Sequence, residues 1–171
     1  MADALRIFVG PRAALVPFKA VLAGVRCYVL TPDAELAVLP FDDEMQDMLH
    51  DRFGTGDWPE DQAIALSTTD QTFAAECSQH APLAYVQCDE VEGALLQSAA
   101  VWQLGQATVG PVTLDLSGAG AGRSPALQPM NIALRALGVV ARDGTDERTS
   151  FGLAEFTSNV VIHARGWPLR V

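Results

Sequence analysis

The stretch from Pro82 to Ser117 constrains the fold more than any other part of the chain. It holds three apolar runs, PLAYVQC, QSAAVWQL and PVTLDLS, which glycines and polar residues separate. The first and third runs alternate two sets of side chains with a period of two, which is the spacing of a strand. We therefore expect an antiparallel meander with strands at residues 83–88, 98–104 and 112–117.

The middle run also fits a helix, because several of its side chains recur at helical intervals, and periodicity alone leaves residues 94–104 open between helix and strand. The punctuation around it favours a strand. Gly93, Gly105 and the pair Gly110-Pro111 fall where tight connections between neighbouring strands are expected.

Two segments outside the meander have the one-sided apolar pattern of surface helices. In residues 42–53 the acidic start and the closing Gly54 are typical of helix ends, and residues 127–137 end at Gly138 in the same way. Both apolar stripes must cover something. We expect a single α+β domain over residues 1–171, with a mainly antiparallel sheet, centred on the meander at 83–117, packed on one side by these helices.

The rest of the chain gives shorter patterns, bounded by glycine, proline or polar residues. We expect two helices: one over 13–24, with Pro17 in its first turn, and one begun by Thr69 or Asp70 and running to about Gln79. We expect a hairpin from residues 26–30 and 35–39 and a turn at 143–146. Further strands are expected at 5–9, 63–67, 139–142 and 160–164.

The charge of the chain is unevenly distributed. The net charge is −10, and residues 27–122, which we call the acidic segment, hold sixteen Asp and Glu but one Lys or Arg, Arg52, a charge of −15. Such a field repels nucleic-acid phosphates and attracts basic surfaces, although acidic surfaces also serve solubility alone. The charge therefore argues against nucleic acid and favours a basic protein as partner.

Within the acidic segment, one helix and the loop after it hold the candidate partner-binding residues. These are Asp43, Asp47, Asp57, Trp58, Glu60 and Asp61. The indole of Trp58 either folds back onto the core, as loop tryptophans usually do, or faces a partner. The carboxylates of this region match no calcium-loop register, so we expect no metal.

The cysteines and the N-terminus indicate a cytoplasmic protein. Cys27, Cys77 and Cys88 are odd in number and form no CxxC pair, which argues against a disulfide framework. The first ten residues lack the basic and apolar regions of a secretory signal. The apolar residues 13–30 include charged side chains and Pro17, so no membrane helix is expected.

Cysteine and histidine side chains also raise two kinds of chemistry. Cys77, His80 and Cys88, with His50, have poor spacing for a zinc site, because only Cys77 and His80 lie close together in the chain. A cysteine nucleophile with His80 or His163 as its base needs more than composition to support it. We therefore expect no metal and no cofactor, and assign no catalytic residue.

A glycine-rich segment is the best candidate for binding a small ligand. It consists of Gly118, Gly120, Gly122, Arg123 and Ser124, between a predicted strand and a predicted helix. Glycines let backbone amides approach a phosphate, but the segment lacks the Lys of a P-loop, and the next acidic residue is as far away as Asp143. It resembles the turn by which a class of acetyltransferases holds the coenzyme A pyrophosphate. The alternative is a flexible surface loop.

The motifs AYVQCD, QSAAVWQLG, NIALRALGV, DGTDE and FGL follow one another over residues 82–153. In their spacing they resemble uncharacterised bacterial proteins. The resemblance implies a strand at residues 98–104 and implies no activity.

Together these patterns predict a cytoplasmic protein that binds other proteins through an acidic surface, and the resemblance implies a bacterial one. Inhibitors or immunity proteins for basic partners are one such class. The alternative is a small enzyme that binds a nucleotide or coenzyme A at residues 118–124. The absence of a catalytic signature favours the non-enzyme, and the sequence leaves a homo-oligomer open.

Overall fold

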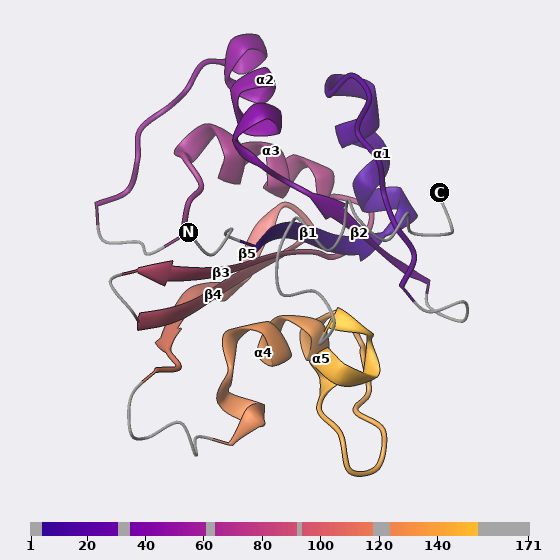
Figure 1. Cartoon of the computed structure of the whole chain (residues 1–171). Coiled ribbons are helices and arrows are strands. Elements are labelled where there is room, and N and C mark those ends of the chain that lie inside the picture. The colour runs from indigo at the N-terminus through magenta and orange to yellow at the C-terminus, as the bar shows by residue number, and fades with distance from the viewer. Residues whose placement is uncertain (1–4, 31–34, 61–63, 92–93, 118–123, 154–171) are drawn as a thin grey trace.

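A five-stranded antiparallel sheet in the order β2-β1-β3-β4-β5 forms the centre of the molecule (Figure 1). The computed structural model describes residues 5–30, 35–60, 64–91, 94–117 and 124–153. The strands are β1 (Leu5–Pro11), β2 (Leu36–Pro40), β3 (Leu83–Val91), β4 (Ala94–Gln103) and β5 (Gln106–Asp115). The α+β class and the antiparallel sheet are thus confirmed.

The predicted meander is confirmed as β3, β4 and β5, so the middle run is a strand rather than a helix. Leu104 (φ 53°) and Gly105 (φ 78°) connect β4 to β5 in a two-residue turn of the kind that needs positive φ at both positions. The expectation for Gly110-Pro111 is wrong. This pair lies inside β5, where two residues stand opposite one of β4 and the register shifts.

Helices cover both faces of the sheet, whereas the sequence pattern predicted one. On one face lie α1 (Arg12–Val21), α2 (Asp43–Phe53) and α3 (Thr68–Cys77); on the other lie the short 3₁₀ helix η1 (Pro125–Leu127), α4 (Pro129–Ala136) and α5 (Glu147–Ser150) (Figure 1). The helices predicted at 42–53 and 127–137 exist, but they lie on opposite faces.

The reason is that the central strands are apolar on both sides. In β1, Phe8 points to the α1–α3 face while Ile7 and Val9 point to the α4 face, and all three are buried. Tyr85 and Val86 divide in the same way in β3. A strand buried on both faces needs cover on both.

Aromatic rings fill the core under α1–α3. The Phe8 ring lies 4.8 Å from that of Phe18, 5.0 Å from that of Phe41 and 5.2 Å from that of Tyr85, centroid to centroid. The Tyr85 hydroxyl donates to Gln87 Oε1 at 3.1 Å, and burial raises the pKa of Tyr85 far above its ordinary range. Such tilted aromatic contacts add to the stability that comes from buried area.

The core under α4 is mainly aliphatic. Met130 and Leu134 of α4 pack with Phe151 and Leu153 against the sheet. Gln97 of β4 is buried, and its Oε1 accepts from the backbone N–H of Met130 at 2.9 Å, which satisfies a donor in the first turn of α4.

The local expectations have mixed outcomes. The strand at 5–9 and the turn at 143–146 are confirmed. Pro17 lies inside α1, because that helix already begins at Arg12. The strand predicted at 139–142 is wrong, because these residues form no strand. The strand predicted at 63–67 is wrong for residues 64–67, the part of it that is described. The strand predicted at 160–164, the residues 31–34 that join the two strands of the predicted hairpin, and Gly93 lie outside the described residues.

At both outer edges of the sheet, the row of free backbone hydrogen-bonding groups is interrupted. On β2, Tyr28 forms two backbone hydrogen bonds of 2.7 Å with Val38, so this part of the predicted hairpin is present. On β5, Pro111 and the bulge interrupt the strand, and proline has no N–H to donate.

In the described part of the chain, no helix has both the length and the apolar character needed to span a membrane.

Candidate partner-binding surface

Helix α2 displays a row of carboxylates. The Asp42 side chain accepts from Met45 N at 2.9 Å and so caps the helix, as the acidic start predicted. Asp43, Asp47 and Asp51 then recur every four residues and are exposed. Asp43 Oδ1 lies 2.6 Å from Arg6 Nη1 of β1, so one predicted site residue already has a cationic partner.

The loop after α2 continues this surface. Asp57, Trp58 and Glu60 are exposed, and Asp61 lies outside the described residues. The Trp58 side chain remains 50% exposed, and its indole meets the His50 ring edge-to-face at 6.2 Å. Trp58 is therefore more exposed than expected for a loop tryptophan that folds back onto the core.

A second exposed aromatic stands at the end of α2. Phe53 belongs to the apolar stripe of the helix, yet 51% of it is exposed. Its ring lies 5.6 Å from that of Phe73 on α3, at an angle of 30°, and the Arg52 guanidinium carbon lies 5.7 Å from its centroid. Phe53 and Trp58 are the aromatics among the exposed large apolar residues of the described chain.

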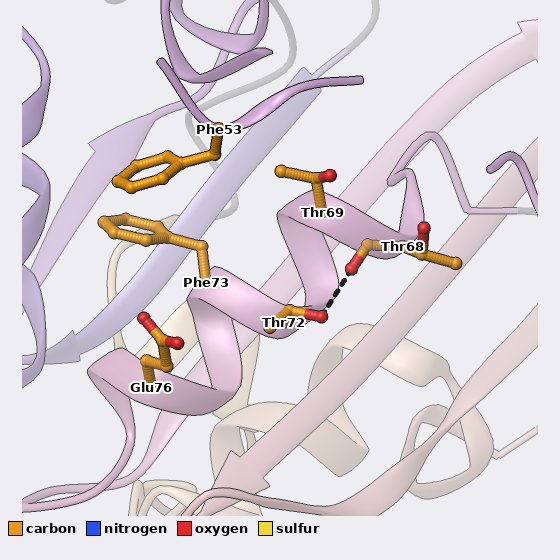
Figure 2. Close-up of a pocket in the computed structure, with 6 residues that line it drawn as sticks. All are labelled: Phe53, Thr68, Thr69, Thr72, Phe73 and Glu76. Atoms are coloured by element: carbon orange, nitrogen blue, oxygen red, sulfur yellow. Dashed lines mark hydrogen bonds between the residues drawn. The ribbon is translucent and has the colours of Figure 1, made fainter. Parts of the chain in front are cut away.

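A pocket of about 240 Å³ opens between Phe53 and α3 (Figure 2). Its lining, which defines the Phe53 pocket, consists of Phe53, Thr68, Thr69, Thr72, Phe73 and Glu76. Thr68 Oγ1 accepts from the Asp57 N–H at 2.9 Å, which fastens the loop to α3. A Cβ on Gly56 (φ 70°) would lie 2.5 Å from the same oxygen, so the close approach of the loop needs glycine.

Under this surface lies a buried polar network that our sequence analysis missed. Asp70 Oδ2 accepts from Gln46 Nε2 at 2.6 Å and from Ser67 N at 2.8 Å, and His50 Nε2 lies 3.0 Å from Asp70 Oδ1. Ser67 caps α3, and with Asp70 it forms a capping box. The signal was the Ser-x-x-Asp spacing of residues 67–70, read instead as a cap at Thr69 or Asp70.

The Ser67, His50 and Asp70 side chains do not form a catalytic triad. In a triad the two ring nitrogens of the histidine serve different partners, whereas here His50 Nε2 lies 3.0 Å from both Ser67 Oγ and Asp70 Oδ1. Ser67 is also completely buried, which keeps substrates from its hydroxyl. The network instead holds α2, the 64–67 segment and α3 together.

The cysteine and histidine candidates are not brought together. Cys77 packs in the core under α1–α3, whereas Cys88 packs against the core on the opposite face. Among the described residues, no group of three potential metal ligands occurs, and His163 lies outside them. Burial, with the nearby Glu76 charge, raises the pKa of Cys77 to about 12, so at neutral pH this side chain is a thiol.

We therefore expect the Cys77 thiol of the folded protein to resist alkylation. Iodoacetamide at pH 8, followed by peptide mass spectrometry, should leave Cys77 unmodified in buffer and modify it in denaturant, because only the unfolded chain exposes a thiolate-forming side chain. Rapid modification of Cys77 in buffer would contradict its placement in the core.

The glycine-rich candidate lies mostly outside the described residues. Of its members only Ser124 is described; it is exposed and precedes η1. It borders an open hollow of about 610 Å³ that also contains Arg135, Asp146 and Glu147. Glu147 Oε1 holds the Arg135 guanidinium at 2.7 and 2.8 Å, so the described cation of this hollow is neutralised. Phosphate binding at 118–124 stays a prediction.

Comparisons with protein-family models, with curated proteins and with solved structures find no match to this chain.

Proposed function

We propose that this protein is a binding module that holds a basic protein partner on the surface formed by α2, the 54–60 loop and α3. The observation that carries the proposal is the coincidence, on one surface, of exposed carboxylates with two half-exposed aromatic side chains, Phe53 and Trp58. Charge draws a cationic partner in, and aromatic anchors supply most of the binding energy at interfaces.

Several features of the structure support this use of the surface. Asp47 and Asp51 of α2 and Asp57 of the loop are exposed close to the aromatics in the chain. The buried Asp70 network fixes the two helices beneath them, and a rigid surface pays less entropy on binding. Inhibition of a cationic protein in the cytoplasm is the role that fits best.

The proposal is tested with a random peptide-display library selected on the immobilised protein. We expect the enriched peptides to carry Lys or Arg beside an apolar residue. Their dissociation constants should rise about tenfold or more between ionic strengths of about 0.01 and 1 M, because the Debye length falls from about 30 to 3 Å over that range. Isothermal titration calorimetry with synthetic copies of the peptides measures this.

A pair of matched double variants locates the surface. Phe53→Ser with Trp58→Ser should abolish binding of the enriched peptides, whereas Leu127→Ser with Val140→Ser, which also replaces two exposed apolar residues, should leave it unchanged. Peptides without cations, or equal losses in both double variants, would show that the surface is not what binds.

A further inference from the structure

The Phe53 pocket combines two kinds of wall. The adjacent, tilted rings of Phe53 and Phe73 form an apolar wall, and the α3 face with its threonines runs along the other side (Figure 2). Glu76, three residues after Phe73 on α3, lines one end. A ligand that fills this pocket therefore meets apolar surface along its length and a carboxylate at its end.

Two polar groups of the pocket, Thr72 and Glu76, are set to accept hydrogen bonds. Thr72 Oγ1 donates its proton to the Thr68 backbone oxygen at 2.8 Å, so toward the pocket its hydroxyl can only accept. The Glu76 carboxylate accepts as well when ionised. The six lining residues include no cation. At the Thr72 and Glu76 end of the pocket, a complementary ligand group is thus a hydrogen-bond donor with positive charge.

We infer that the Phe53 pocket receives one lysine or arginine side chain of the partner. The inference deepens the proposed function and rests on it for the source of that side chain. Lys and Arg have an apolar stem and a cationic head, which matches the apolar wall and the carboxylate end. The guanidinium or ammonium group also has a favourable interaction with an aromatic face.

Arg52 provides a second test of the inference, because its positive charge should weaken the binding of a cation in the pocket. It is the one Lys or Arg of the acidic segment, and its guanidinium carbon lies 5.7 Å from the centroid of the Phe53 ring. This guanidinium repels a second cation at the same ring and competes with it for the aromatic face. Removing the charge of Arg52 should therefore strengthen binding in the pocket.

The pocket is tested without the partner, by NMR titration of the ¹⁵N-labelled protein with two small probes. These are N-acetyl-arginine methylamide and N-acetyl-lysine methylamide, whose relative shifts show which head group the pocket prefers. We expect saturable shifts of amides in α3 and around Phe53. The neutral counterparts, the citrulline and norleucine methylamides, should give no saturable shift there; if they bind as well as the cations, the inference is overturned.

Three single-charge variants locate the effect. Glu76→Gln should weaken binding of the cationic probe about two- to fivefold, the range of an exposed ion pair, and Arg52→Gln should strengthen it by a similar factor. Glu44→Gln removes the same charge from the other end of α2, roughly 13 Å along the helix from Phe53, and should change little. Equal weakening by Glu76→Gln and Glu44→Gln would mean diffuse attraction and would overturn the pocket.

A failure of the pocket inference can be distinguished from a failure of the proposed function. If the enriched peptides bind with the expected salt dependence while the small probes give no saturable shift at the pocket, the binding surface stands and the pocket inference falls. If the probes bind as expected while the peptides bind without cations, the pocket stands and the role of the acidic surface falls.

Discussion

Replacing Leu134 with aspartate is expected to reduce the free energy of unfolding by about 4 kcal/mol or more, enough to unfold many domains of this size. Leu134 is completely buried in the apolar core under α4. A carboxylate there must either lose its hydration or take up a proton. Urea denaturation followed by circular dichroism measures the loss.

Two comparisons give this result its meaning. Leu134→Ala removes the same packing without adding charge and should cost about 2–5 kcal/mol. Asp47→Asn, on the exposed face of α2, should change stability by less than about 0.5 kcal/mol. Equal and small effects of Leu134→Asp and Asp47→Asn would contradict the burial of α4 against the sheet.

Replacing Asp70 with alanine is expected to cost about 3 kcal/mol or more, the second largest effect. The Asp70 side chain is completely buried and accepts from Gln46, from the Ser67 backbone and from the Ser67 hydroxyl, and it contacts His50. Its loss leaves several buried donors without an acceptor, and an unsatisfied buried donor costs more than a hydrogen bond gains.

The control for Asp70→Ala is Glu76→Ala on the same helix. Glu76 is exposed, so its replacement should change the urea midpoint little. Hydrogen exchange adds a local measurement: the amides of α2 and α3 should lose protection in Asp70→Ala before those of α4. An Asp70→Ala protein as stable as the Glu76→Ala protein would show that the network contributes nothing to stability.

Most of the elements could be predicted because their signals are local. Alternating side chains fixed β3 and β5, and the acidic start with Gly54 at the end delimited α2. Gly105 marked the β4–β5 turn because that turn requires positive φ. Signals of this kind depend on neighbours in the chain and need no knowledge of the tertiary structure.

The side on which each helix packs could not be predicted in the same way. Residues 5–9 and 83–86 read as nearly continuous apolar runs, which indicate burial on two faces, but the pattern does not say which helix covers which face. The segment 139–142 has apolar residues of strand type, yet Val140 is 81% exposed and pairs with none of the described strands. The strand propensity of this segment did not determine its structure, because strand formation also depends on the neighbouring strands and on burial.

The candidate surface was predicted in part. Exposure of Asp47, Asp57 and Glu60 followed from their place in a helix and loop. The exposure of Phe53 did not, because the helical pattern assigned it to the buried stripe, whereas α2 ends there and the ring contacts that of Phe73 at 5.6 Å. The pocket itself depends on the approach of α3 to the end of α2, which no local pattern encodes.

The interrupted edges of the sheet limit how this protein can associate with others. A partner that adds a strand needs a continuous row of free N–H and C=O groups. Tyr28 already uses those of Val38 on β2, and Pro111 breaks the row on β5. Both edges therefore disfavour a partner that adds a strand and favour one that recognises side chains. A single substitution on the partner can then end the association, so specificity can change without any change in the fold.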